Sequence, residues 1–404
     1  MKYVTRTSIF SSGERFPVLV YAESYQPVVL PTRYVIDVRR ETKQAGTLER
    51  DVRILKWLYE WSDLRGLDLE ERLRRGETLS VSEITGFCRY LRARRSETIV
   101  GSINLQGVEQ VDILLPHTFS AYIAIVEDFL IWAATLYIPK TALAGHIKET
   151  VENVKESLQN AFRGNQIGGE SIPRQGLTVE EVVNLREVIK PGAKRNPFKA
   201  SLQFRNHVII ELMLATGIRR GELLKIKLRH LPYGPKITLS IERAPDDPED
   251  TRRNEPRVKT LEREIPLPKW LAKALWEYAK KNRKKGNHPY LFTSNRDGSP
   301  LGLAAINFIF SLLVQKCFPN LNGRLSPHIM RHTFNSGIQD KGMELGWDEE
   351  RVKKVQRYLG GWSEQSIMAD RYARRFIEAQ ALEVAEKYQT ALYEDIVLGP
   401  EHVF

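Results

Sequence analysis

Two adjacent arginines, Arg219 and Arg220, follow a glycine at which an apolar helix is expected to end, within the stretch Ala-Thr-Gly-Ile-Arg-Arg-Gly-Glu-Leu-Leu. A guanidinium beside a helix N-terminus can grip two phosphate oxygens, and backbone N–H groups add further donors. The alternative is a local ion pair between Arg219 and Glu222, three residues later. The stretch therefore predicts either an anion site or a structural pair.

A second motif, Ser-Pro-His-Ile-Met-Arg-His-Thr-Phe, places His328 and Arg331 three residues apart. On a helix, this spacing puts both side chains on one face. A titratable imidazole next to a permanent cation can exchange a proton at a phosphate whose charge the arginine holds. We expect His332 to point elsewhere and to serve packing or hydrogen bonding. Zinc binding by the two histidines is disfavoured, because the motif lacks the glutamate of HExxH and has Arg331 in its centre.

A third stretch, residues 359–375, contains Tyr372 on a predicted helix crowded by Arg371, Arg374 and Arg375. Nearby cations favour the phenolate and would make this hydroxyl a better nucleophile toward phosphorus. The alternative is an exposed basic helix whose tyrosine only packs.

These three stretches, in this order, resemble the tyrosine recombinase (phage integrase) family, over residues 178–380. The family pattern has a TG-x-R-xx-EL box, an HxxRH box, and LGH or LGW followed by a tyrosine. The resemblance implies that Arg219 and Arg331 hold the scissile phosphate. It also implies that His328 is the HxxR histidine and that Tyr372 is the nucleophile.

The same resemblance assigns further site residues. Residues 258–268 look like the family's lysine-bearing hairpin strand, so Lys259 would protonate the departing 5′-oxygen. Trp362 follows a second glycine where the family usually has histidine, and an indole N–H can position a phosphate oxygen but cannot shuttle a proton. Glu222 would support the arginine helix, and His332 is a second supporting residue.

The activity that this resemblance implies is site-specific breaking and rejoining of DNA through a 3′-phosphotyrosyl link, with no metal, no ATP and no other cofactor. The implied partners are double-stranded recombination sites, three further copies of the chain in a homotetramer, and accessory directionality factors. The unusual N-terminus favours integration or transposition of a mobile element. Two alternatives share this fold type: a type IB topoisomerase and a non-catalytic DNA-binding protein.

A rival chemistry is a metal-dependent nuclease that uses the carboxylates of a Pro-bounded hairpin loop, Asp246, Asp247, Glu249 and Asp250. No histidine supports these carboxylates, so the sequence favours a solvated turn instead.

Composition agrees with a nucleic-acid partner, since the 404 residues carry a formal net charge of +11. Lys and Arg number 22 against 21 Asp and Glu in residues 1–165, so the excess lies in residues 166–404. The two cysteines form no CxxC pair, which disfavours a disulfide framework or structural zinc. The longest apolar run, residues 129–138, is too short to span a bilayer, and the N-terminus does not resemble a secretion signal. We therefore expect a cytoplasmic protein.

Periodicity predicts a mainly α-helical fold with a small β component. Residues 1–45 form an extension with short strands at 18–21 and 28–30, and residues 46–165 form a four- or five-helix domain that would bind DNA. Residues 166–177 form a linker, and residues 178–390 form a mixed α/β catalytic domain with a hairpin of strands 237–241 and 257–267. Residues 391–404 form a tail that could contact a second protomer.

Six arginines are candidate DNA contacts outside the chemical centre: Arg89, Arg92, Arg94, Arg95, Arg220 and Arg263. For the four in the helical domain, the alternative is a solvated helix end.

Overall fold

The computed structural model describes residues 2–75, 77–98, 116–136, 144–163, 175–233, 235, 237–366 and 368. The chain divides into two compact units, residues 1–172 and 173–404, which are described separately. Most of the predicted linker and the whole predicted tail lie outside the described residues.

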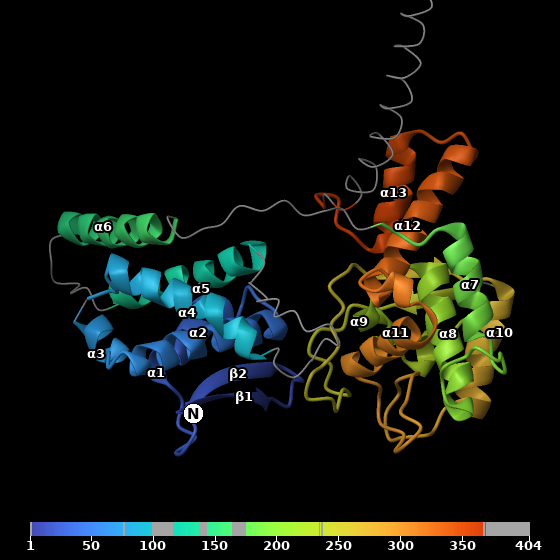
Figure 1. Cartoon of the computed structure of the whole chain (residues 1–404), viewed down its shortest axis with the longest axis horizontal. Coiled ribbons are helices and arrows are strands. Elements are labelled where there is room, and N and C mark those ends of the chain that lie inside the picture. The colour runs from blue at the N-terminus through green and yellow to red at the C-terminus, as the bar shows by residue number, and fades with distance from the viewer. Residues whose placement is uncertain are drawn as a thin grey trace, which may run out of the picture. The chain divides into compact units, whose positions relative to one another are not determined.

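Unit 1 combines one β-hairpin with a set of helices (Figure 1). Its elements are β1 (Tyr3–Ile9), β2 (Arg15–Tyr21), α1 (Val29–Tyr34), α2 (Ala45–Leu64), α3 (Leu69–Arg74), α4 (Val81–Thr98), α5 (Pro116–Leu136) and α6 (Ala144–Arg163). The two strands are antiparallel, with Tyr3 opposite Tyr21. A π-helical turn, Val35–Arg39, continues α1.

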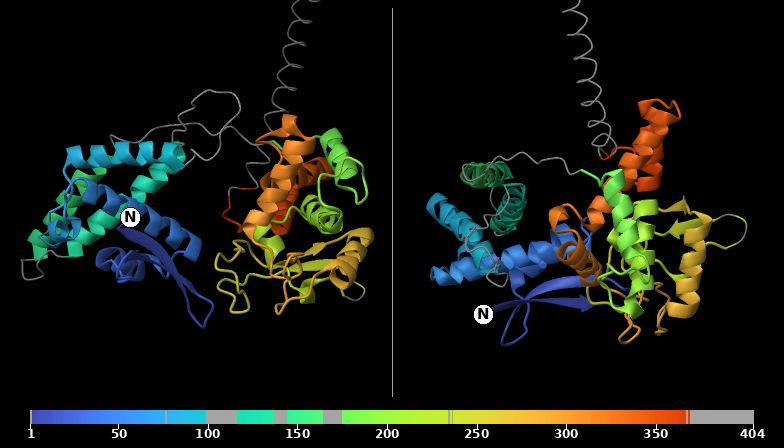
Figure 2. Two further views of the ribbon diagram at one scale, coloured as in Figure 1. Left: turned by 60° about the horizontal axis from the view of Figure 1, so that its bottom comes forward. Right: turned by 45° about the vertical axis from the view of Figure 1, so that its right-hand side comes forward.

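The first 45 residues share one hydrophobic core with the helices. Phe16, Leu19 and Tyr34 are buried in the same cluster as Leu55 and Phe129. Figure 2 shows the hairpin (dark blue) beside the first helices, and both strands contact α2. The N-terminal extension therefore packs as part of this unit.

One strand prediction in this region is wrong, because residues 28–30 enter helix α1. The extended segment ends at Val28, whose N–H donates to the carbonyl of Leu19 at 2.8 Å, and Pro27 before it forms a single bridge with Val20. Pro31 then lies within the first turn of the helix, where its missing N–H leaves no hydrogen bond unmade.

Helix α5 is long and apolar enough to cross a membrane by length and composition alone. Its buried residues include Phe119, Ile123, Val126, Phe129 and Leu130, all in the core of unit 1. Packing against α2 and α6 therefore accounts for its hydropathy.

Unit 2 packs its helices around α8 (Ala200–Thr216), which contacts α7 (Val179–Ile189), α10 (Lys269–Glu277) and α12 (Pro327–Glu344). The other α-helices in the described part of unit 2 are α9 (Arg220–Lys225), α11 (Leu303–Cys317) and α13 (Glu349–Gly360), and α12 and α13 lie side by side (Figure 1). Thr178 and Glu181 form a capping box, in which the two side chains cap the start of α7 reciprocally.

The hairpin of unit 2 consists of β3 (Thr238–Ile241) and β4 (Arg263–Pro266), paired antiparallel. The second strand is shorter than predicted. Residues 257–262 are irregular, because the N–H of Leu261 donates to the carbonyl of Gly361 at 3.0 Å instead of joining the ladder.

Candidate active site

The first arginine of the site lies at a sharp break between α8 and α9. Helix α8 ends at Gly217, whose φ of 61° is left-handed, and an added Cβ there would overlap the ring of Phe334. Arg219 is the N-cap of α9, and its backbone N–H donates to Glu222 Oε2 at 2.7 Å. Its guanidinium Nη1 lies 3.7 Å from Glu222 Oε1, so the structural pair considered above is also present.

Arg331, on α12, is buried and donates to two backbone carbonyls. Its Nη1 bonds to the Gly217 oxygen at 2.8 Å, and its Nη2 bonds to the Gly360 oxygen at 2.7 Å. Arg219 Nη1 lies 3.5 Å from the same Gly360 oxygen. The structure therefore brings the two arginines of separate motifs to one point.

Trp362 completes this group. The guanidinium carbon of Arg331 lies 4.9 Å from the centre of the indole ring, which is within range of a cation–π interaction. The ring is buried and lies against Gly360, where an added Cβ would be 2.9 Å from its atoms. Trp362 therefore fixes the face of the Arg331 guanidinium.

Glu222 lies at the centre of a buried ionic group. Arg263 donates to both of its carboxylate oxygens, at 3.2 and 3.1 Å, and the Thr260 hydroxyl donates to Oε1. Burial raises the pKa of the Glu222 carboxyl, but the charges of Arg263 and Arg331 and these hydrogen bonds outweigh it and leave the pKa below its usual value. Glu222 is therefore an anion in the folded protein.

Arg263 was predicted to contact DNA, and the structure places it elsewhere. Its side chain is 1% exposed and pairs with Glu222. Its Nε also donates to the carbonyl of Leu359 at 2.7 Å. A DNA phosphate has no access to this guanidinium.

Lys259 lies in the irregular segment before β4 and not on the strand. Its side chain is exposed, while its neighbours Val258 and Thr260 are buried. The backbone on both sides is therefore anchored, and the ammonium faces solvent.

His328 and His332 face each other, which corrects the prediction that His332 points elsewhere. Their Nε2 atoms are 2.9 Å apart, and the rings are nearly perpendicular. The i, i+4 spacing on α12 accounts for this contact. His332 is thus a hydrogen-bonding residue, as expected, but its partner is His328. Arg331 points into the buried site, while His328 is exposed.

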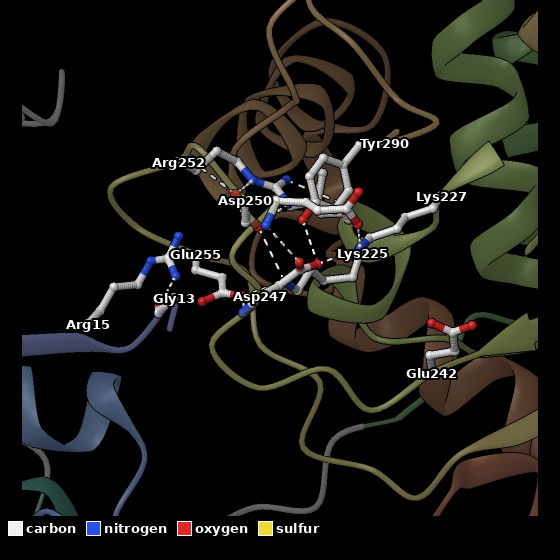
Figure 3. Close-up of polar contacts among 12 residues, drawn as sticks. Gly13, Arg15, Lys225, Lys227, Glu242, Asp247, Asp250, Arg252, Glu255 and Tyr290 are labelled. Carbon is white, nitrogen blue, oxygen red and sulfur yellow. Dashed lines mark hydrogen bonds and ion pairs between the residues drawn. The ribbon is translucent and has the colours of Figure 1, made fainter. Parts of the chain in front are cut away.

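Two of the four loop carboxylates, Asp247 and Asp250, are buried, so the predicted solvated turn is wrong for these two, whereas Glu249 is exposed. Figure 3 shows Asp247 and Asp250 among cations from two segments: Lys225 is the last residue of α9 and Lys227 follows two residues later, while Arg252 comes from the loop itself. Hydrogen bonds from Lys227 and Tyr290 outweigh the effect of burial and lower the pKa of Asp247. Among the described residues, no group of three or more His, Cys, Asp or Glu could hold a metal ion.

This ionic cluster was not predicted from the sequence. The sequence does contain one indication of it: Lys225 and Lys227 alternate with the apolar residues Leu224 and Ile226, which are buried in the core. Lysines interleaved with core residues indicate buried ammonium groups that need anionic partners.

The remaining predicted residues are spread over both units. Arg220 is exposed and donates to Asn307 at 2.7 Å, while in unit 1 Arg89 is exposed and Arg92 stacks on Phe119 at 4.4 Å. The side chains of Arg94 and Arg95 and the whole of Tyr372 lie outside the described part of the chain.

Curated relatives match the C-terminal part of the sequence. Over 163 residues the chain is 30% identical to tyrosine recombinase XerC of Staphylococcus epidermidis, covering 39% of this chain and 45% of the relative. Over 182 residues it is 25% identical to tyrosine recombinase XerC of Lacticaseibacillus casei, covering 44% and 51%. The chain thus spans about half the length of the curated relatives it matches.

Among solved structures, the chain is similar to a Tn1549 transposon integrase in complex with transposon right-end DNA. The identity is 19% and the TM-score 0.39, with 75% of this chain and all of that chain covered. It is also similar to XerH recombinase bound to its difH substrate, at 15% identity and a TM-score of 0.42, with 77% and 85% covered.

The model of the phage integrase family matches residues 175–378, about half of the sequence. This range contains the arginines that meet at the Gly360 carbonyl and every other residue predicted to be catalytic. The chain therefore belongs to the phage integrase family of tyrosine recombinases.

Proposed function

We propose that this protein breaks and rejoins DNA at specific sites through a 3′-phosphotyrosyl intermediate formed by Tyr372. The convergence of Arg219 and Arg331 on one carbonyl, with Trp362 against Arg331, is the observation that carries the proposal. It supports a site in which two guanidinium groups can act on a single phosphate.

The chemistry follows from the charge that develops during the reaction. Attack of the Tyr372 oxygen on a phosphodiester forms a phosphorus–oxygen bond and breaks the bond to the 5′-oxygen, through a five-coordinate transition state with extra negative charge on the non-bridging oxygens. Arg219 and Arg331 would stabilise this charge. Loss of one preorganised donor of this kind typically reduces the rate on the order of 10²–10³-fold.

Two further residues would handle protons. Lys259 would protonate the departing 5′-oxygen, and its exposed ammonium between buried neighbours suits a group that must meet DNA. His328, paired with His332, would assist the proton transfers or hold the phosphate. The energy of the broken bond is conserved in the phosphotyrosyl link, so the 5′-hydroxyl of another strand can reverse the step.

The substrates we propose are duplex recombination sites at the ends of a mobile element, joined by a homotetramer of this chain in the cytoplasm with the help of directionality factors. Unit 1 would hold the duplex through Arg89 and Arg92 and through the neighbouring Arg94 and Arg95.

The deciding experiment is incubation of the protein with a nicked suicide duplex that carries the end of the element encoding it. A covalent protein–DNA adduct is expected without added metal. Tyr372→Phe should abolish the adduct and leave specific DNA binding intact. Persistence of the adduct in this variant would show that another residue is the nucleophile.

A control with supercoiled plasmid distinguishes the proposed recombinase from a type IB topoisomerase. A type IB topoisomerase relaxes plasmid that lacks any cognate site, whereas the proposed recombinase requires its site. Efficient relaxation of such a plasmid would contradict the proposal.

A further inference from the structure

Arg263 joins three segments that are far apart in the sequence. Its guanidinium donates to Glu222 on α9, to the Thr260 hydroxyl at 3.2 Å, and to the carbonyl of Leu359 at the end of α13 at 2.7 Å. It also donates to the Leu261 carbonyl at 3.2 Å. One buried side chain thus links α9, the segment before β4 and the end of α13.

Each of these segments carries a proposed catalytic residue. Arg219 immediately precedes α9, and Lys259 immediately precedes Thr260. Trp362 follows the turn that begins at Leu359. The distances between these residues therefore depend on how the three segments are held.

The 359–361 turn, made of the last two residues of α13 and its C-cap Gly361, shows this dependence most clearly. Its three carbonyls accept hydrogen bonds from three different donors: Leu359 from Arg263, Gly360 from Arg331, and Gly361 from the N–H of Leu261. The position of this turn is therefore coupled to that of the phosphate-binding Arg331.

The Arg263 guanidinium has the geometry that these contacts demand. Its two Nη atoms form a bidentate pair with the Glu222 carboxylate, while Nε is directed to Leu359. A planar fork with fixed donors can make these bonds at once, whereas the single ammonium of lysine cannot.

We propose that Arg263 is a positioning residue that sets the spacing of Arg219, Lys259 and the 359–361 turn by linking Glu222 to Leu359. The proposal rests on the proposed DNA-cleaving function. It replaces the prediction that Arg263 contacts DNA.

The test is Arg263→Lys in the full-length protein, with Arg205→Lys as the matched control. Arg205 is also a buried arginine of unit 2, and it donates to Asn206 and to the carbonyl of Thr293, at 3.0 to 3.1 Å. Adduct formation is followed in single turnovers at saturating suicide substrate, at a temperature where circular dichroism shows both variants folded.

We expect Arg263→Lys to slow adduct formation on the order of 10²-fold, the effect of a misplacement of about 1 Å in a reacting site. The affinity for intact DNA should stay unchanged. Arg205→Lys should form the adduct at the wild-type rate, so that the loss reflects the position of the contacts and not the loss of a buried guanidinium.

A second pair of variants keeps the proposal open to refutation if Arg263→Lys does not fold. Glu222→Gln retains the shape of the carboxylate and removes its charge, and it should slow adduct formation with DNA affinity unchanged. Arg263→Gln should leave the salt dependence of DNA binding unaltered. Loss of a phosphate contact would instead reduce the magnitude of the negative slope of log K against log salt by about 1.

Equal adduct rates for Arg263→Lys and Arg205→Lys would overturn the inference, and so would a reduced salt slope for Arg263→Gln. A wild-type protein that forms no adduct at all would instead overturn the proposed function. The two failures are therefore distinguishable in the same experiment.

Discussion

Gly361 is the residue at which a single methyl group tests the packing of the site. Its φ of 60° is left-handed, a conformation that is unfavourable for alanine by about 1–2 kcal/mol. An added Cβ would also lie 2.5 Å from Arg263 Nη1 and 2.8 Å from Thr260 Cβ, well inside the ordinary contact distance of about 3.5–4.0 Å. Gly361→Ala must therefore displace the guanidinium by about 1 Å.

The expected loss of stability combines the two effects. Gly192 is a matched control, because its φ of 80° is also left-handed and nothing lies within 4 Å of an added Cβ. We expect Gly192→Ala to lower the free energy of unfolding by about 1–2 kcal/mol. Since breaking a buried ion pair costs about 3–5 kcal/mol, displacement of Arg263 from Glu222 in addition to the backbone strain should bring the loss for Gly361→Ala to about 4–7 kcal/mol.

The assay is urea unfolding of both full-length variants, with hydrogen exchange of peptides from unit 2 and single-turnover adduct formation at saturating DNA. Gly361→Ala should lose exchange protection at β4 and at the end of α13, and should form the adduct more slowly than Gly192→Ala. If the two variants unfold and react alike, the close packing of Arg263 on this turn does not matter, and the reasoning is refuted.

Three further changes probe other parts of unit 2. Asp247→Asn should destabilise the protein by about 3 kcal/mol at neutral pH. Because the pKa of Asp247 is lowered on folding, its stabilising effect is present above about pH 4 and is lost as the pH falls further. The urea unfolding midpoints of the wild-type protein and the variant should therefore converge in acid. His332→Gln should slow adduct formation about tenfold, which is less than the 10²–10⁴-fold contribution of a group that transfers the proton itself, and it should alter the pH profile of the rate. An unchanged pH profile would contradict a role of His332 through His328. Trp362→Ala should slow the reaction more than Trp362→Phe, since phenylalanine retains a ring against Arg331, and equal rates would argue against that contact.

Local signals predicted much of unit 2. Gly217 was expected to end a helix, and it adopts the left-handed conformation that favours glycine. The Thr178 capping box was equally readable, because all its hydrogen bonds lie within four residues. Features of this kind depend on neighbours in the sequence, so a single sequence contains the information.

Features that depend on distant partners were not predictable in the same way. The segment before β4 was predicted to be part of the strand. Instead, the N–H of Leu261 donates to the carbonyl of Gly361, one hundred residues later in the sequence. Arg263 carries the charge that a DNA phosphate would attract, and only the fold shows that it is buried against Glu222. The predictions of a longer strand and of a DNA contact at Arg263 were wrong for the same reason: contacts with residues distant in the sequence override local propensity.

Two buried arginines of unit 2, Arg252 and Arg331, differ in the groups that bind them directly. Arg252 is held by the carboxylate of Asp250, at 2.7 Å, so its charge is balanced within the protein. Arg331 is held by the carbonyls of Gly217 and Gly360, whose dipoles orient a guanidinium without cancelling its net charge. Preorganisation of this kind spares the guanidinium reorganisation during the reaction. Both arginines also donate to backbone carbonyls, so the difference between them is the buried carboxylate that binds Arg252 directly.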